Sequence, residues 1–255
     1  MMEDLGSALP QRSLLYRVGK RWRPAFDRVM ANCSKAPDQP VLDPADFPWT
    51  ARLEAGWARI RAEALAALAD LNAAAPPLRD ISPDHRRIAE PDRWRSYFLW
   101  GYGYRMEANC RDCPETVALL EGVPGLNSAF FSILKPGAHI PRHRGVTKAI
   151  MTCHLGLKTP TAGRCEMQVG DETVSWADGR CLVFDDTYPH EVWNDTPETR
   201  IVLLIQFRRP LRQPGKLLGD LFLTGVRHSP FVQEGRRNLE AWRRENGQAR
   251  TDKAA

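Results

Sequence analysis

Apolar residues follow a helical period in three parts of the chain. From Leu53 to Leu71 they recur at i, i+3, i+4 and i+7 among strong helix formers, which predicts a helix that packs one stripe on the rest of the fold. Residues 13–32 show a similar spacing with basic residues in between, and Pro24 is expected to interrupt that helix. Residues 114–121 predict a short helix that begins at Pro114, where the missing N–H costs nothing.

The pattern changes between Asn127 and Pro210. Short runs of β-branched and aromatic residues alternate there with Gly, Pro, Asn and Asp, as is typical of short antiparallel strands and turns. Gly170 and Asp171 are expected to form a tight hairpin turn. An edge strand is expected within residues 93–104, and further strands near residues 127–134, 149–157, 164–169, 172–176, 181–185, 191–195 and 200–208. This pattern predicts a mainly β protein with a jelly-roll core and an N-terminal helical layer.

The remaining segments surround this core. Residues 36–49 are expected to form an extended connection and residues 75–92 a loop, because both are rich in proline. About a dozen residues at each end are expected to be frayed or disordered. We divide the chain into a basic helix with a proline-rich lead-in (1–52), a β domain with supporting helices (53–215), and a basic C-terminal helix with a tail (216–255).

Composition and charge set limits on location and partners. With 255 residues the chain can form one substantial domain, and its net charge of +5 fits an anionic substrate or a membrane surface. No nucleic-acid-binding module accompanies that charge. No apolar run reaches the roughly eighteen residues that span a bilayer, and the N-terminus lacks the order of a signal peptide. A cytoplasmic location is therefore expected.

Six cysteines are scattered along the chain, which predicts reduced thiols rather than a disulfide framework. Cys153 and Cys181 lie in strand-like runs and are expected in the core. Cys110 and Cys113 form one C-x-x-C pair, but no second pair or suitably spaced histidines follow it. We therefore expect buried or turn thiols there rather than a zinc site.

Two histidines and one arginine carry the candidate chemistry. His143 lies in a Pro/Gly-bounded loop after a strand, and His190 lies at the entry to another strand. Two such histidines on neighbouring strands can bind one inward-facing metal, as in iron(II) sites with open positions, although a structural role is the alternative for each. Arg200 opens the most apolar strand, TRIVLLIQF. Inside a barrel its guanidinium needs a partner, and a dicarboxylate suits it best.

At these positions the sequence resembles the aspartyl/asparaginyl β-hydroxylases, which are iron(II) and 2-oxoglutarate dependent dioxygenases with a double-stranded β-helix, a cupin-like jelly roll. The resemblance covers roughly residues 94–210 and is carried by HIPRHRG, TCHLGL, FDDTYPHEVWND and the strand of Arg200. Four motifs in the same order make it specific.

The resemblance also implies a role for each residue of the site. His143 and His190 would be the two iron ligands. Arg200 would bind the distal carboxylate of 2-oxoglutarate with the help of Ser132, and His154 would contact the carboxylate nearer the metal.

Two positions depart from the family pattern. The common His-x-Asp/Glu reads His143-Arg144-Gly145 here, so the carboxylate ligand is absent, as in the peptide-hydroxylating branch. A second arginine on the cosubstrate side of that branch is Thr152 in this chain. The segments VLDPADFPW and PETVALLEGVPG instead resemble the bacterial branch that hydroxylates the acyl chains of lipid A.

The resemblance implies a dioxygenase that hydroxylates an unactivated C–H bond. The first expectation for the acceptor is the β-carbon of aspartyl or asparaginyl residues, or of a related amino acid. A lipid acyl-chain hydroxylase and a non-enzymatic cupin-like small-molecule-binding protein are the alternatives. A zinc-dependent hydrolase would need a third good ligand, which Gly145 does not supply.

Other polar residues receive structural interpretations. His139 lies two residues into a turn, and His85 and His228 lie in loops without a constellation around them. Asp185 and Asp186 precede the second candidate ligand and are expected to accept backbone N–H bonds in a turn.

Basic residues leave two further questions open. The helix at residues 13–32 could lie on an anionic membrane with Trp22 on its apolar side, or it could be a solvated helix packed on the domain. Arg142, Arg144 and Lys148 flank the proposed iron site. They would either attract an anionic substrate or form a solvated basic rim.

Overall fold

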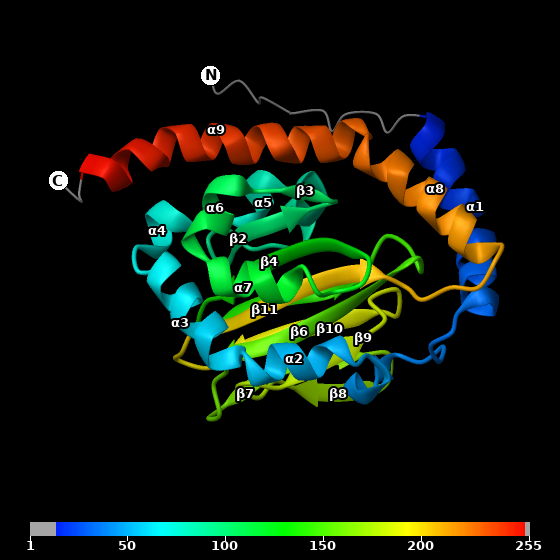
Figure 1. The fold of residues 1–255 in the computed structure, drawn as a ribbon, viewed down its shortest axis with the longest axis horizontal. Coiled ribbons are helices and arrows are strands. Elements are labelled where there is room, and N and C mark those ends of the chain that lie inside the picture. The colour runs from blue at the N-terminus through cyan, green and yellow to red at the C-terminus, as the bar shows by residue number, and fades with distance from the viewer. Residues whose placement is uncertain (1–13, 253–255) are drawn as a thin grey trace, which may run out of the picture.

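Two antiparallel sheets packed face to face form the centre of the molecule (Figure 1). The computed structural model describes residues 14–252. The larger sheet has the strand order β1-β9-β6-β11-β4-β2-β3 and the smaller one β5-β10-β7-β8. The strands are β1 Val41–Leu42, β2 Trp94–Gly101, β3 Tyr104–Arg105, β4 Leu126–Leu134, β5 Ala138–His143, β6 Ile150–Lys158, β7 Arg164–Val169, β8 Glu172–Ser175, β9 Cys181–Phe184, β10 His190–Asp195 and β11 Arg200–Arg208. This is the predicted jelly roll.

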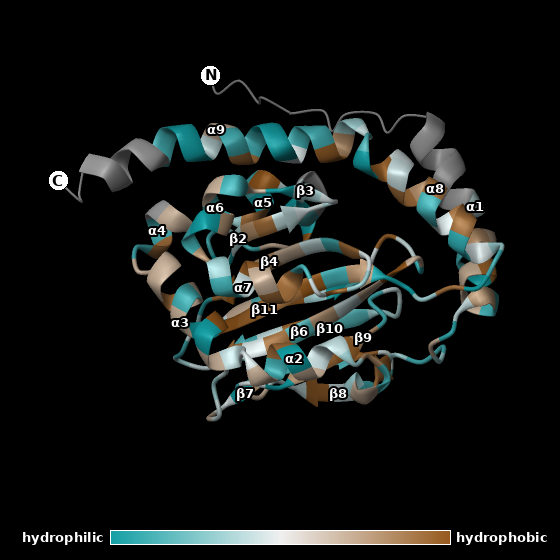
Figure 2. Ribbon diagram, in the orientation of Figure 1, coloured by the Kyte–Doolittle hydropathy of each residue, from teal (hydrophilic) through white to brown (hydrophobic). Residues whose placement is uncertain are grey.

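The helices lie around this core. They are α1 Leu14–Cys33, α2 Trp49–Ala55, α3 Trp57–Ala67, α4 Leu71–Ala74, α5 Leu78–Ile81, α6 Glu107–Asp112, α7 Pro114–Leu120, α8 Gly215–Arg227 and α9 Pro230–Asp252, with 3₁₀ turns η1 Pro44–Asp46 and η2 Pro83–Arg87. Figure 2 shows α9 as largely hydrophilic, whereas the central strands are mostly hydrophobic. Among the described residues, no helix is both long and apolar enough to cross a membrane.

Every strand expected between residues 127 and 208 forms, and Gly170 adopts the positive φ of +59° that a tight turn requires. Strand β5 lies where a loop after a strand was expected, and that expectation was wrong. Pro141 and two arginine residues within or just beyond β5 make the segment resemble a loop. Its pairing with β10, on one side only, makes β5 an edge strand, where proline is tolerated.

The larger sheet is buried on both faces. Ile201, Leu203 and Ile205 of β11 belong to the core between this sheet and the helices, whereas Val202 faces the space between the two sheets. Burial on both sides explains why β11 is apolar almost throughout. Alternation along the strand also directs Arg200 toward the space between the sheets.

The predicted helix from Leu53 to Leu71 is two helices, and the prediction of one continuous element was wrong. The helix is interrupted at Gly56, where an added Cβ would lie 2.5 Å from Leu119 Cδ1. The second helix, α3, ends at Ala67. The predicted apolar stripe does pack on the larger sheet, through side chains such as Ile60. Close contact with α7 therefore decided the break.

Three other expectations about helices were also wrong. Helix α1 continues through Pro24, whose ring is exposed, so that water can satisfy the carbonyl group that loses its donor. Residues 75–92 contain α5 and η2 instead of a plain loop. Helix α9 runs to Asp252, through most of the tail that was expected to be disordered. The expectation that about a dozen N-terminal residues are frayed concerns residues outside the described part of the chain.

Candidate active site

The fold brings the two candidate metal ligands together. His143 ends β5 and His190 begins β10, and the two residues are Cα partners in the antiparallel register. Their ring centroids are 4.1 Å apart. A register shift in β10 directly after His190 re-aims the chain at this point. The two imidazoles therefore share one position at the end of the smaller sheet.

Hydrogen bonds orient both rings in the same way. The Nδ1–H of His143 donates to the Pro141 carbonyl at 2.9 Å, and the Nδ1–H of His190 donates to the Tyr188 carbonyl at 3.0 Å. Each neutral ring then keeps its lone pair on Nε2, the form in which histidine binds a metal. Burial and the neighbouring His190 lower the pKa of His143 to about 4, and burial lowers the pKa of His190. Both rings are thus neutral near pH 7.

The Asp186 carboxyl fills the position next to Gly145. An added Cβ at Gly145 would lie 2.0 Å from Asp186 Oδ1, so this glycine cannot carry a side chain without a rearrangement. Asp186 Oδ2 accepts a hydrogen bond from Thr152 at 3.2 Å, while Oδ1 is buried without a partner. Burial and the charge of Asp185 raise the pKa of Asp186 to about 7. Within residues 14–252, no three His, Cys, Asp or Glu side chains cluster as a metal site.

Arg200 is a buried cation for which the described residues provide no ionic partner. Its side chain is only 2% exposed, and its guanidinium carbon lies 4.6 Å from the centroid of the Trp176 ring. The Nε and Nη1 atoms have no hydrogen-bond acceptor in the described part of the chain. Burial lowers the pKa of Arg200 to about 10, so the guanidinium stays charged at neutral pH. A buried, charged, unpaired donor group of this kind indicates a binding site for an anion.

His154 supplies another unpaired donor on the same side of the larger sheet. Its Nδ1 accepts a hydrogen bond from the Trp176 indole N–H at 3.1 Å, which places the ring proton on Nε2. That Nε2 is buried and has no partner. Burial and the charge of Arg200 lower the pKa of His154 well below its usual value. Trp176, which the sequence analysis did not single out, therefore contacts both anion-binding candidates.

Ser132 lies beside these groups on β4. Leu134 pairs with Arg200 and Ser132 with Val202, so Ser132 and Arg200 face the same side of the sheet. The Ser132 hydroxyl accepts a hydrogen bond from the Trp94 indole at 3.0 Å and keeps its own proton to donate.

His85 is a second residue that the sequence analysis underrated. Its ring packs edge-on against Trp94 with centroids 5.2 Å apart. Burial and the nearby His143 lower the pKa of His85 to about 4, so the loop interpretation without a constellation was wrong. Only the packing of η2 on β2 brings this histidine near the site, and no sequence motif indicates it.

The other histidine and cysteine candidates lie apart from the site. His139 belongs to β5 rather than to a turn, and its Nε2 contacts Glu191 at 2.7 Å while its ring stacks on Trp193. Its structural interpretation agrees with these contacts. Cys110 and Cys113 are buried free thiols on the outer side of the larger sheet.

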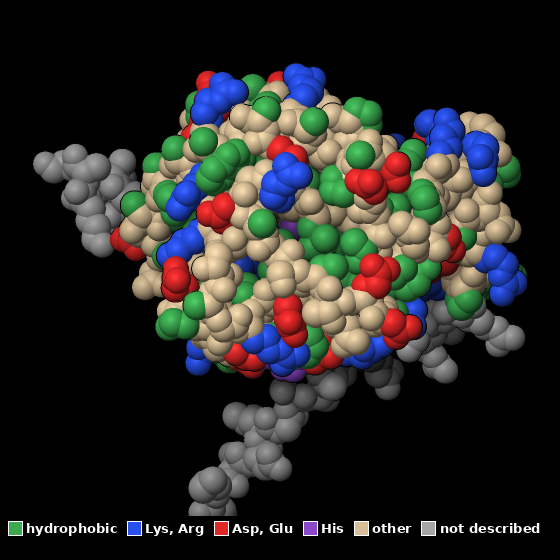
Figure 3. All heavy atoms as spheres, turned by 90° about the horizontal axis from the view of Figure 1, so that it is seen from below, with side chains coloured by type: hydrophobic (Ala, Val, Ile, Leu, Met, Phe, Trp, Pro, Cys, Tyr) green, Lys and Arg blue, Asp and Glu red, His purple; other side chains and the backbone are tan. Residues whose placement is uncertain are grey.

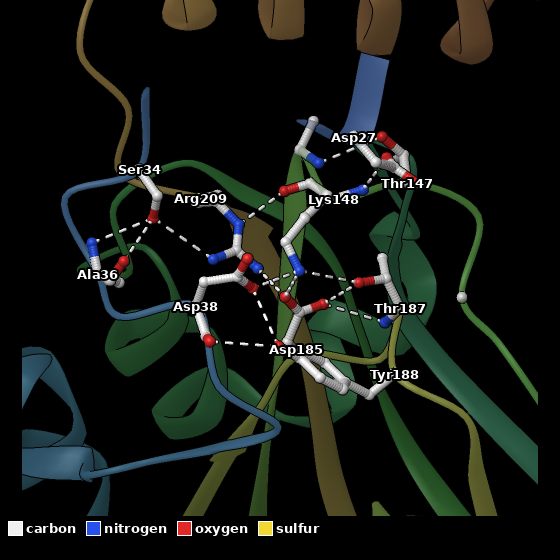
Figure 4. A network of polar contacts seen from close by, with 12 residues as sticks. Asp27, Ser34, Ala36, Asp38, Thr147, Lys148, Asp185, Thr187, Tyr188 and Arg209 are labelled. Atoms are coloured by element: carbon white, nitrogen blue, oxygen red, sulfur yellow. Dashed lines mark hydrogen bonds and ion pairs between the residues drawn. The ribbon is translucent and has the colours of Figure 1, made fainter. Parts of the chain in front are cut away.

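A buried ion cluster holds the turn that carries His190 (Figure 4). The Asp185 carboxylate, which is fully buried, pairs with Lys148 at 2.8 Å and with Arg209. Lys148 also pairs with Asp38 at 2.6 Å, so the cluster ties the N-terminal segment to the turn. Lys148 is therefore not part of a solvated rim. Asp185 does accept the predicted backbone N–H bond, but its main partners are cations.

A family model described as aspartyl/asparaginyl beta-hydroxylase matches residues 54–210, which include all of these candidate residues. The chain belongs to the aspartyl/asparaginyl β-hydroxylase family. It is therefore a hydroxylase, as the sequence motifs predicted.

Two relatives of this hydroxylase differ in how much of their length is matched. The ornithine lipid ester-linked acyl 2-hydroxylase of Rhizobium tropici is 38% identical over 210 residues, which cover 82% of this chain and 74% of that protein. The human aspartyl/asparaginyl beta-hydroxylase is 30% identical over 197 residues, which cover 74% of this chain and 25% of that protein. A solved Pseudomonas putida prolyl-4-hydroxylase shares 20% identity with a TM-score of 0.39, over 60% of this chain and 87% of that one.

Proposed function

We propose that the hydroxylase binds iron(II) through Nε2 of His143 and His190. The support is the pair of Nδ1 hydrogen bonds, which leaves both Nε2 lone pairs available at adjacent positions. A site with two histidine ligands leaves several positions of an octahedral ion open for cosubstrate and water. The Asp186 carboxyl in the space beside Gly145 explains why no side chain at position 145 completes the ligand set.

The cosubstrate that we propose is 2-oxoglutarate. The observation that carries this proposal is the set of donors on Arg200 and His154 that are buried without partners among the described residues, next to a charged guanidinium that an anion would pair with. One carboxylate would pair with the guanidinium, with Ser132 as an additional donor, and the other would accept from His154 Nε2. When bound, iron, 2-oxoglutarate and O₂ together supply the oxidant that hydroxylates a C–H bond and yield succinate and CO₂.

The protein contributes orientation and the exclusion of water. Burial of Arg200 and His154 strengthens their hydrogen bonds to a bound anion, because the local dielectric is low. Trp176 fixes both groups, through the cation–π contact with Arg200 and the indole hydrogen bond to His154. These contacts would hold both groups in fixed orientations toward a bound anion.

The acceptor that we propose is the ester-linked acyl chain of an amino-acid lipid. The match to 74% of the rhizobial lipid hydroxylase, at 38% identity, favours this class over the partial match to the human protein. A pocket of about 410 Å³ opens beside the segment that follows His143 and the segment that precedes His190. It is lined by charged residues of both signs, as a zwitterionic headgroup requires: Arg23, Asp27, Arg144 and Lys148.

The β-carbon of an aspartyl or asparaginyl residue is the second candidate. It is favoured by Gly145 in place of a carboxylate ligand and by the similarity to the human aspartyl/asparaginyl beta-hydroxylase. Mass spectrometry separates the two candidates. The enzyme is incubated with iron(II), 2-oxoglutarate and either ornithine lipid in detergent micelles or an aspartate-containing peptide. We expect one added oxygen on the lipid acyl chain, and an oxygen added only to the peptide would reverse the assignment.

We also propose a cytoplasmic location. All six cysteines are free thiols, and several are buried close to one another, as Cys153 and Cys181 are. This usage is typical of a reducing compartment.

A further inference from the structure

Exposed apolar side chains concentrate at one end of the molecule. Among the described residues, seven large hydrophobic side chains are exposed, and six of them lie on α1, on α8 or in the loop after β5. Leu217 and Leu221 are 56% and 62% exposed, and Trp22 is 67% exposed. Single exposed leucines are ordinary on a protein surface, but a cluster of this kind marks an interaction site.

These side chains form one band across two helices. Helices α1 and α8 lie side by side, and the Phe26 and Phe222 rings meet at their contact with centroids 4.8 Å apart (Figure 1). Trp22 and Val29 are spaced i, i+7 on α1 and lie beside Phe26 on the helix surface. On α8 the exposed leucines, 217, 218 and 221, continue the band from Phe222 outward.

The charge of these two helices is mainly positive. Together α1 and α8 contain seven basic and two acidic residues, a net charge of +5, which equals the net charge of the whole chain. The two acidic residues are neutralised: Asp27 pairs with Arg23, and Asp220 pairs with Lys216 and Arg208. Basic side chains project from this end of the molecule in Figure 3, at the right. An apolar band within a basic surface fits an anionic bilayer.

This surface is joined directly to the candidate active site. Arg23 of α1 donates to the Gly145 carbonyl, two residues after His143, and Asp27 accepts from the Lys148 backbone N–H at 2.9 Å. Val146 in the same loop is 51% exposed. A bilayer that touches the band would therefore reach the loop that follows β5.

We propose that α1 and α8 form a docking surface for an anionic lipid bilayer. Leu217, Leu218, Leu221 and Trp22 enter the interfacial region, while the basic residues contact lipid phosphates. The second carbon of an ester-linked acyl chain lies next to the ester, at the depth of the headgroup boundary. A peripheral enzyme can reach that atom without spanning the membrane. This catalytic role rests on the proposed function, whereas the binding itself does not.

Vesicle sedimentation tests the surface with matched variants. The full chain is mixed with vesicles of phosphatidylcholine alone or of phosphatidylcholine with phosphatidylglycerol. We expect binding only to the anionic vesicles, and weaker binding as salt rises. The double variant Leu217→Ser, Leu221→Ser should bind at least about tenfold more weakly. Leu65→Ser removes a leucine of α3 that is 42% exposed and lies outside the band, and it should bind like the wild type.

Three results would overturn the proposal. The first is wild-type protein that does not bind anionic vesicles, and the second is a double variant that binds them as tightly as Leu65→Ser. The third is a dimer in solution that the double variant converts to monomer, because a second copy would then cover the band. An unchanged circular dichroism spectrum and thermal unfolding transition show that a variant is folded. Hydroxylation of lipid in detergent micelles by a variant that fails on vesicles would leave the proposed function intact.

Discussion

Single residues in this site are defined by the hydrogen bonds that they lack. Most buried polar groups in a folded protein have partners, yet Arg200, His154 and Asp186 each keep a buried atom without one. The three residues come from three different segments of the chain: β11, β6 and the turn after β9. Burying a polar atom without a partner costs free energy, and proteins tolerate this cost at sites where a bound ligand supplies the partner. The unpaired atoms therefore mark the site.

At this scale the first prediction concerns His143. His143→Ala should abolish 2-oxoglutarate-dependent hydroxylation and weaken iron(II) binding by more than about a hundredfold, because even the loss of a residue that only orients a ligand costs about 10- to 100-fold. The control is His139→Ala, which removes an imidazole from the outside of the same strand and should retain activity. Calorimetric titration with manganese(II), a non-reactive substitute, measures the affinity. Full activity in His143→Ala would refute the ligand assignment.

The second prediction concerns Arg200. Arg200→Ala should raise the KM for 2-oxoglutarate by at least about a hundredfold, since a buried charge-assisted pair contributes roughly 3–5 kcal/mol. Arg200→Lys should restore little, because an ammonium cannot form the bidentate contact.

The unpaired guanidinium of Arg200 also leads to a prediction about stability. Arg200→Met should not lower the free energy of unfolding of the ligand-free protein, because it replaces an unpaired buried cation by an apolar side chain. Urea titration without 2-oxoglutarate measures this quantity. A large loss of stability would mean that the guanidinium has a structural partner instead.

At the scale of elements, the position of the site depends on how loops are held. The turn between β9 and β10 carries Asp185 and Asp186 and leads into His190, and the loop after β5 carries Gly145. The Gly145 backbone N–H donates to the Asp186 carbonyl at 2.7 Å, which joins the two segments. The ion cluster around Asp185 then fixes both of them to the N-terminal segment.

We therefore expect Asp185→Asn to destabilise the protein by about 3–5 kcal/mol, because it leaves the buried Arg209 without its carboxylate and Lys148 with only the half-exposed Asp38. Iron(II) binding should weaken as well, since the turn before His190 loses its anchor. Glu115→Gln is the control, because its pair with Arg59 is half-exposed and should contribute less than about 1 kcal/mol. Equal losses in the two variants would show that the cluster does not hold the turn.

At the scale of the whole molecule, buried neutral histidines make stability depend on pH. The folded-state pKa of His143 is about 4, below the value of 6.5 expected in the unfolded chain. Between these values the unfolded state binds more protons, so the contribution of His143 is complete above pH 6.5 and is lost as the pH falls toward 4. The raised pKa of Asp186 acts in the opposite direction, with a contribution that is lost as the pH rises through 7.

Comparing the wild type with His143→Ala isolates the contribution of this histidine to the pH dependence of stability. In the metal-free state, the stability of the wild type relative to His143→Ala should fall by up to about 1.4 kcal/mol per pH unit between pH 6.5 and 4. The Asp186 contribution cancels in this difference. Unfolding titrations across that range measure it, and a flat difference would mean that the ring is already protonated when folded.

Much of the fold was readable from the sequence, because the β segment has strong local signals. Alternating apolar residues and turn residues predicted seven strands of the jelly roll, and a basic residue at the start of an apolar strand indicated Arg200 as a binding group. The motifs around His143 and His190 predicted the family. The division into three segments, 1–52, 53–215 and 216–255, stays a prediction.

Other features depend on contacts between residues far apart in the chain. Gly56 breaks a helix because Leu119 packs against it, and β5 forms because β10 pairs with it despite Pro141. The Asp186 carboxyl beside Gly145 and the burial of Lys148 likewise come from other segments. Local sequence determines which backbone conformations are low in free energy and which side chains can take part in the chemistry. Only tertiary packing decides which of those side chains are buried, which lose their partners, and which lie next to one another.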